Sequence, residues 1–132
     1  MTTTVTLPVV DRFLAGIEAG QPIGDVYAAD ATLDATVPGW RFQLQGVDAI
    51  LDEYGRWFAD PGRFHSIERH PLPDGVLIRY VQDSGVDAAA ITVHHMHHLT
   101  IVDDKVTRDV VFCGGRWGPA AVAQMGAAAH AG

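Results

Sequence analysis

The strongest constraint on the fold is a pair of long strand-like segments in the second half of the chain. Residues 88–102 and 105–113 are rich in apolar and β-branched residues, and only residues 103–104, two aspartates, separate them. Such an arrangement around a two-residue polar turn predicts an antiparallel β-hairpin. Two further strands are expected at 64–70 and 76–82, joined by a segment rich in proline and glycine. The second half of the chain is therefore expected to form a sheet.

Helical periodicity dominates the first half. Apolar residues recur at three- and four-residue spacing over residues 8–20, and a second, short helix is expected over 22–29. The broadest apolar stripe begins at Gly46 and predicts a helix that ends before Pro61. Short strands at 31–37 and 40–45 precede that helix. Helices followed by an antiparallel sheet define an α+β fold.

Composition narrows the class of protein. A chain of 132 residues predicts one domain, taken as residues 1–118, with a flexible or partly helical tail at 119–132. The formal charge of −7 argues against a nucleic-acid partner, since phosphate backbones are also negative. A single cysteine, Cys113, excludes an internal disulfide framework. With neither a basic leader nor an apolar run of membrane-spanning length, we expect a cytoplasmic protein without a membrane partner.

The order of these elements, together with three short motifs, resembles the NTF2-like (SnoaL-like) family. The motifs are VYAADATLD at 26–34, GVDAI at 46–50 and DKV at 104–106. The resemblance implies a cone in which a curved antiparallel sheet wraps on three N-terminal helices. Members of the family include ketosteroid isomerases, polyketide cyclases, dehydratases and proteins that only bind or associate, so the fold alone does not assign an activity.

Ketosteroid isomerisation itself is not expected. By resemblance, the isomerase's general-base aspartate corresponds to Ala35, and its acid donor on the penultimate strand corresponds to Met96. Neither a methyl group nor a thioether can exchange a proton, so these positions do not support that reaction.

A histidine-rich run at 94–98 (HHMHH) is the densest chemical signal in the chain. If residue 102 pairs with residue 105, His98 lies directly opposite Asp109, close enough for an imidazole–carboxylate hydrogen bond. By resemblance, this face looks into the cone. A histidine oriented by a carboxylate is a common general acid or base. The alternative is that two polar groups on a half-buried sheet merely satisfy each other.

Side chains alternate along a strand, so His95 and His97 are expected on the other, outer face. An H-x-H pair can chelate a metal, but no third ligand is placed by the sequence, so no metal site or cofactor is predicted. By resemblance this outer face meets its copy, and the two histidines are expected to pack in a homodimer interface.

The expected ligand is a small apolar molecule held in the cone. On the face of His98 and Asp109, four further residues are expected to contact it: His94, Met96, Val111 and Cys113. Five aromatic residues either line the cavity or form plain core: Phe13, Tyr27, Trp40, Tyr54 and Trp57. As an enzyme, the protein would be a cofactor-independent cyclase, isomerase or dehydratase acting on a carbonyl compound. The alternative is a non-catalytic ligand-binding or dimeric assembly domain.

Overall fold

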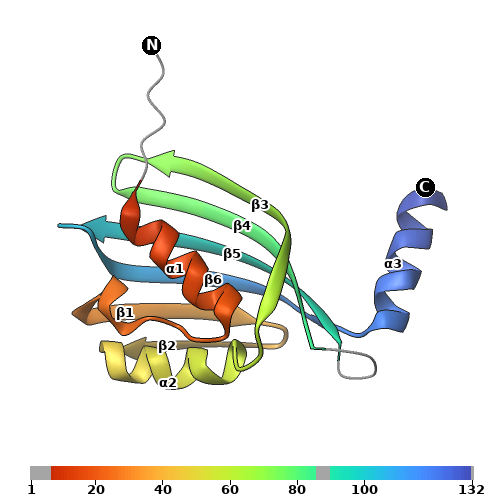
Figure 1. Ribbon diagram of the computed structural model, residues 1–132, viewed down its shortest axis with the longest axis horizontal. Helices are drawn as coiled ribbons and strands as arrows, with labels where there is room; N and C mark the ends of the chain where they lie inside the picture. The colour runs from red at the N-terminus through yellow and green to blue at the C-terminus, as the bar shows by residue number, and fades with distance from the viewer. Residues whose placement is uncertain (1–6, 86–89, 132) are drawn as a thin grey trace, which may run out of the picture.

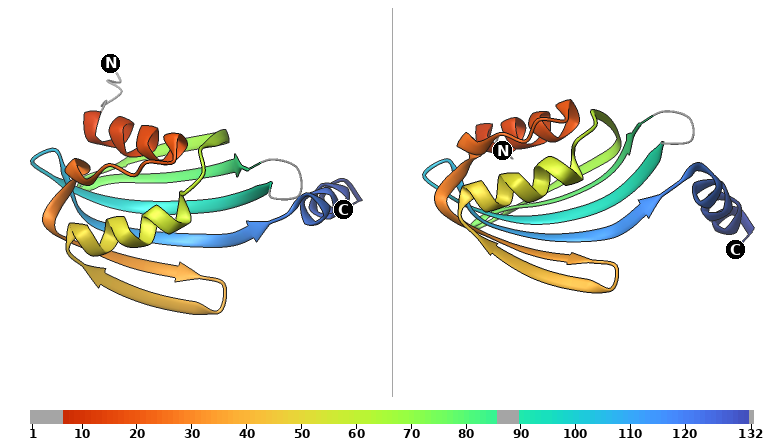
Figure 2. Two further views of the ribbon diagram at one scale, coloured as in Figure 1. Left: turned by 60° about the horizontal axis from the view of Figure 1, so that its bottom comes forward. Right: turned by 90° about the horizontal axis from the view of Figure 1, so that it is seen from below.

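A computed structural model of the chain describes residues 7–85 and 90–131, with side chains as far as Met125. A curved six-stranded sheet carries two helices on its concave face (Figure 1, Figure 2). In chain order the elements are α1 (Pro8–Ala19), the 3-10 turn η1 (Gly24–Val26), β1 (Tyr27–Val37), β2 (Trp40–Gln45), α2 (Val47–Trp57), β3 (Gly62–Leu72), β4 (Gly75–Ser84), β5 (Ile91–Val102), β6 (Lys105–Trp117) and α3 (Pro119–Ala131). The fold is α+β, as the sequence predicts.

The strand order across the sheet is β2-β1-β6-β5-β4-β3. Neighbouring strands are antiparallel except for β1 and β6, which pair in parallel. The sheet is therefore mixed rather than wholly antiparallel. The parallel pair brings the N-terminal strand against the C-terminal one, so residues from both ends of the chain meet at the centre of the sheet.

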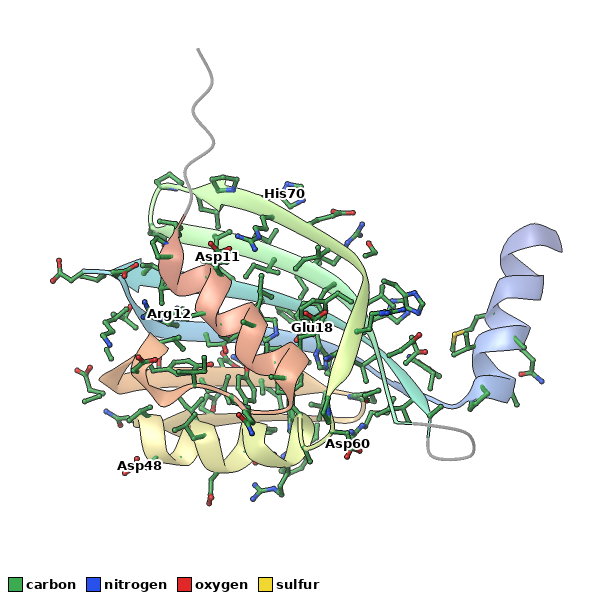
Figure 3. The ribbon with its side chains drawn as sticks, viewed as in Figure 1. Asp11, Arg12, Glu18, Asp48, Asp60 and His70 are labelled. Carbon is green, nitrogen blue, oxygen red and sulfur yellow. The ribbon has the colours of Figure 1, made fainter. Side chains whose placement is uncertain are left out.

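The two helices on the concave face bury the apolar stripes that the sequence predicts. On α1 the stripe includes Val10, Phe13 and Ile17, which are all buried against the sheet. Two polar contacts also join α1 to β3: Arg69 Nη1 lies 2.7 Å from Asp11 Oδ1, and Glu18 Oε2 accepts a 3.3 Å hydrogen bond from the backbone of β3. Figure 3 shows Asp11 near the start of α1 and Glu18 near its end. These contacts hold α1 across the strands that carry the site.

Three segments differ from the expected elements. The short helix expected at 22–29 is only the η1 turn, because the chain enters β1 already at Tyr27, whose side chain turns into the core. At the other end, β6 continues to Trp117, and α3 then projects from the end of the sheet (Figure 1, Figure 2). The strand expected from residue 88 begins at Ile91, and residues 88–89 lie outside the described residues.

A β-bulge in the β5–β6 hairpin controls which side chains face the core. Next to the turn Ile101 pairs with Val106, but one step further Thr100 pairs with Arg108, so Thr107 is an extra residue on β6. An extra residue exchanges the two faces of the bulged strand relative to its partner. Beyond the bulge the inward positions of β6 carry odd numbers, in register with the odd-numbered inward positions of β5. Asp109 therefore shares the concave face with Leu99 and the two histidines before it.

In the described part of the chain, no helix is both long and apolar enough to cross a bilayer.

The hairpin turn supplies a stability prediction. Asp103 and Asp104 have φ values of 52° and 59°, the left-handed pair that a type I′ turn requires. A residue with a Cβ atom pays about 1 kcal/mol for this conformation, which glycine adopts freely. We expect Asp104→Gly to raise the free energy of unfolding by about 1 kcal/mol in urea titrations, whereas Asp104→Ala should not raise it. Equal effects of the two variants would show that backbone conformation is not the cause.

Candidate functional site

A cavity of about 230 Å³ opens at one end of the cone. It lies where the C-terminal end of α2 and the β1–β2 turn approach the ends of β5 and β6. Its wall is formed by eight residues: Val37, Pro38, Trp57, Val93, His95, Cys113, Gly115 and Arg116. Apolar surface predominates, and the polar side chains that converge on it are an imidazole, a thiol and a guanidinium. This combination is typical of a small-molecule site.

His95 is the buried titratable group in this wall. It lies on the concave face of β5, with only 4% of its surface exposed. The rings of Trp57 and Phe58 flank its imidazole, each with a centroid distance of 5.6 Å. Its Nδ1 atom lies 3.0 Å from the hydroxyl of Tyr80 on β4. The ring is thereby held in one orientation, and Nε2 is the nitrogen left for a bound molecule.

The hydroxyl of Tyr80 continues into a buried hydrogen-bond chain. It lies 3.0 Å from Nε2 of His97 as well as from His95. His97 Nδ1 in turn lies 2.9 Å from Oδ1 of Asp109 on β6. A continuous path of hydrogen bonds therefore runs from the cavity wall to a carboxylate in the core.

The Asp109 carboxylate is completely shielded from solvent. The Tyr54 hydroxyl donates a 2.6 Å hydrogen bond to Oδ2, and the Tyr27 hydroxyl donates one of 3.2 Å to the same atom. With the contact from His97, the carboxylate is surrounded by three donors from β1, α2 and β5. Such complete satisfaction is what allows a carboxylate to remain in a protein interior.

Burial sets the protonation states of the groups around this carboxylate. It raises the pKa values of Tyr27, Tyr54 and Tyr80 well above 10, and the negative charge of Asp109 raises them further. The three hydroxyls therefore keep their protons at neutral pH. Burial has the opposite effect on His95: it lowers the pKa of the imidazole from 6.5 to about 3, with a further lowering by His97. His95 is therefore neutral at physiological pH.

The expected His98–Asp109 pair is wrong, and the structure pairs Asp109 with His97. His98 lies opposite Val110 on the outer face, where its Nε2 is 3.6 Å from Oδ1 of Asp74. The prediction extended the pairing of residues 102 and 105 along the whole hairpin and so did not include the extra residue at the bulge. That residue moves every expected partner by one position and so to the other face.

The same shift corrects the other face assignments on β5. His94 and Met96 lie on the outer face rather than in the cone, and Met96 pairs with Phe112 there. His95 and His97 are buried on the concave face, so they cannot pack against a second copy through the outer face. Because Met96 points outward, it does not occupy the position of the isomerase's acid donor. Of the two positions that argued against ketosteroid isomerisation in the sequence, only Ala35 still does so.

The other residues predicted to contact a ligand lie at different depths. Trp57 and Cys113 line the cavity, whereas the side chain of Trp40 is 69% exposed on β2. Four of the predicted residues are fully packed in the core around or beside the carboxylate: Phe13, Tyr27, Tyr54 and Val111. Ligand contact by any of these residues stays a prediction.

The sequence reasoning missed Tyr80 as a site residue, although its alternation with Ile78 and Gln82 along β4 is a signal for one face of a strand. It placed Phe58 in the apolar stripe of the helix without a role in the site, and it left open whether Arg116 closes the mouth of the cone or caps a partner. The positions of Phe58 and Arg116 depend on how α2 and β6 end, which no local pattern records. Among the described side chains, no group of three or more histidine, cysteine or acidic residues gathers as a metal site would require.

No protein-family model matches the chain, and no curated protein matches it in sequence. Solved structures do match its fold. An NTF2-like protein from Anabaena variabilis aligns with a TM-score of 0.72 at 13% identity, over 87% of this chain and 95% of that one. A candidate isomerase from Bacillus subtilis aligns with a TM-score of 0.66 at 13% identity, over 81% and 84% of the two chains.

A third structure contains a small molecule. It is a protein from Catenulispora acidiphila with a ketosteroid isomerase-like fold, in complex with trimethylamine, and it aligns with a TM-score of 0.64 at 16% identity over 89% and 91% of the two chains. Identities this low establish a shared fold and nothing finer. The chain therefore has the NTF2-like, ketosteroid isomerase-like fold.

Proposed function

We propose that the protein binds a small, largely apolar carbonyl compound in the cavity beside Trp57 and that His95 exchanges a proton with it. The observation that carries this proposal is a neutral, oriented imidazole in the wall of a mostly apolar cavity. A cavity of about 230 Å³ is smaller than the roughly 300–1,000 Å³ typical of sites for drug-sized molecules. The ligand is accordingly a compact one.

Proton exchange at carbon fits the groups present. A neutral imidazole can remove a proton adjacent to a carbonyl group, and the guanidinium of Arg116 in the same wall can attract the oxygen that gains negative charge. An isomerase, a cyclase and a dehydratase all begin with such a step. The reaction class is thus cofactor-independent acid–base chemistry, in line with the isomerase name of one structural neighbour.

Cys113 provides a test of ligand binding, because it is the single cysteine of the chain and lines the cavity. A panel of small cyclic ketones is offered to the protein, and the rate of Cys113 alkylation by iodoacetamide is followed by intact mass. Compounds that occupy the cavity should slow alkylation. A panel without any protection, extended to uncharged apolar molecules of similar size, would contradict a ligand site here.

Proton exchange is then measured on the protecting ketones by following deuterium incorporation from D₂O with NMR. We expect His95→Gln to slow exchange by about 10²- to 10⁴-fold, the usual contribution of a general base, while ligands still protect Cys113. The matched control is His70→Gln, an exposed histidine on the edge strand β3 (labelled in Figure 3) that does not belong to the cavity wall. Wild-type exchange in His95→Gln would refute the base role, and protection without exchange would favour the binding-only alternative.

The neutral state of His95 also makes stability depend on pH. Its pKa is about 3 in the folded protein against 6.5 ordinarily, so between these values the unfolded chain binds a proton that the folded chain does not. The contribution of neutral His95 to the free energy of unfolding is complete above pH 6.5. As the pH falls below that value, the free energy of unfolding decreases by up to about 1.4 kcal/mol per pH unit. In urea unfolding between about pH 7.5 and 5, His95→Gln should flatten this slope, whereas His70→Gln should keep it. An unchanged slope in His95→Gln would show that burial does not suppress its ionisation.

We also propose that the outer face of the sheet associates with a second copy of the chain. Phe112 is 52% exposed there and pairs with Met96 on the neighbouring strand, beside a shallow depression that both residues line. Exposed apolar side chains at the centre of a sheet favour association.

Light scattering tests this association. Wild-type protein should have the mass of a dimer, and Phe112→Asp should reduce it to that of a monomer, because the carboxylate would be buried without a partner. Val102→Asp replaces an equally exposed residue next to the hairpin turn and should leave the dimer intact. A monomeric wild type, or a dimer that survives Phe112→Asp, would contradict the proposal.

A further inference from the structure

The hydrogen-bond chain behind His95 passes through a single hydroxyl group. The oxygen of Tyr80 lies 3.0 Å from Nδ1 of His95 and 3.0 Å from Nε2 of His97. A hydroxyl carries one proton, so it donates to one of these nitrogens and must accept an N–H from the other. The tautomers of the two imidazoles are therefore coupled.

When His97 is neutral, the direction of the chain is fixed by the carboxylate at its buried end. Asp109 Oδ1 accepts the proton of His97 Nδ1, which leaves His97 Nε2 bare to accept from the Tyr80 hydroxyl. The oxygen of Tyr80 then accepts from Nδ1–H of His95. His95 Nε2 is consequently bare, and the ring offers the cavity a proton acceptor.

When His97 is charged, the two hydrogen bonds through the Tyr80 hydroxyl reverse, whereas Nδ1–H of His97 still donates to Asp109. Both ring nitrogens of His97 now carry protons, so Nε2–H donates to the oxygen of Tyr80. The Tyr80 hydroxyl must then donate to His95 Nδ1, and the proton of neutral His95 resides on Nε2. In this state the same imidazole offers the cavity a proton donor.

We propose that His95, Tyr80 and His97 form a proton relay in which the charge of His97 sets whether His95 presents a bare nitrogen or an N–H to the cavity. The role of the relay in catalysis rests on the proposed function of His95. The coupling between the tautomers of His95 and His97 exists without a ligand. Of the four residues in this network, His95 is the one that borders the cavity. The other three, Tyr80, His97 and Asp109, are therefore positioning residues.

The relay balances protons without any further reactant. A C–H bond of the ligand breaks, its electron pair stays on the ligand, and its proton forms a new bond to His95 Nε2. The Nδ1 proton of His95 passes to the oxygen of Tyr80 as the hydroxyl proton passes to His97 Nε2. The ligand has then lost one proton, His95 is neutral again, and the positive charge lies beside the Asp109 carboxylate. Return of the Nε2 proton to another atom of the ligand resets the chain.

Asp109 is the neighbour that distinguishes His97 from His95. The groups that contact His97 come from five elements: Phe13 from α1, Tyr54 from α2, Tyr80 from β4, His95 from β5 and Asp109 from β6, while Tyr27 from β1 donates to the other oxygen of Asp109. Of these, Asp109 is the charged one, and it is negative. His97 is thus the imidazole in contact with a carboxylate, whereas His95 is in contact with a neutral hydroxyl.

Long-range ¹H–¹⁵N correlation of the imidazole rings tests the relay in the wild-type protein, because bare and protonated ring nitrogens have well-separated resonances. Loss of signals in His95→Gln and His97→Gln assigns the two rings. Where His97 is neutral, we expect His95 to carry its proton on Nδ1. As His97 gains charge, the proton of His95 should move to Nε2 with the same midpoint. A His95 ring that keeps Nδ1–H throughout, or that becomes doubly protonated together with His97, would overturn the proposal.

Asp109→Asn should reverse the chain at constant pH. Oδ2 accepts from two hydroxyls, so the amide oxygen takes that place and the amide N–H faces His97 Nδ1. His97 must then carry its proton on Nε2, and His95 should switch to Nε2–H, although residue 109 makes no hydrogen bond to it. The switch should vanish when Tyr80→Phe is added, because the connecting hydroxyl is absent. An Asp109→Asn effect on His95 that persists without this hydroxyl would refute the relay.

Ligand exchange separates the relay from the proposed function. Coupled tautomers in a protein that exchanges no ligand proton would uphold the relay and refute the acid–base activity. Exchange that needs His95 but is unchanged in Tyr80→Phe would uphold the activity and refute the relay in catalysis. If both hold, Tyr80→Phe should slow exchange at least tenfold.

Discussion

The structure depends on the burial of one carboxylate. Moving a charge of this kind out of water costs several kcal/mol even after the protein relaxes, and only well-placed donors can offset the cost. Asp109 receives them from Tyr27, Tyr54 and His97, which lie on three different elements. The first strand, the second helix and the central hairpin must therefore meet at one point. Partial assembly would leave the charge unpaired, so this requirement selects a single arrangement of the concave face.

The elements themselves could be predicted from sequence, because periodicity records which side of a helix or strand is apolar. The stripe on α2 matches the structure, with Ile50 and Tyr54 buried, whereas in β2 the strand is present but Trp40 is exposed. The partner of Asp109 could not be predicted in this way. Thr107 disrupts no hydrophobic pattern, since it begins a polar run, residues 107–109, between Val106 and Val110. As an extra residue it nevertheless exchanges the faces of β6 relative to β5. A bulge is fixed by pairing between strands, which a single sequence does not record.

The fold contributes less to the functional argument than this network does. The likeness to solved structures establishes the NTF2-like fold and leaves the chemistry of the cavity open, because one fold can host unrelated activities. The chemistry follows from where the buried hydrogen bonds end. One end of the chain is a neutral imidazole in the cavity wall, and the other is a carboxylate without contact to water. Because His95 connects the buried hydrogen bonds to the cavity wall, the network supports the proposed role of His95 in the chemistry of a bound molecule.

Four histidines in five consecutive positions therefore make up two sets with different chemistry. The outward pair, His94 and His98, lies on the outer surface of the sheet, where His94 is exposed and His98 is partly exposed beside Asp74. The inward pair, His95 and His97, is buried beneath the helices and beside Tyr80, and of the two only His95 lines the cavity. The hydrogen bonds of His97 lead through Tyr80 to His95 and the cavity on one side and to Asp109 on the other. In the proposed relay, strand alternation thereby connects the ionisation of a core residue to the molecule that occupies the cavity, so that ligand chemistry and core electrostatics form one coupled system.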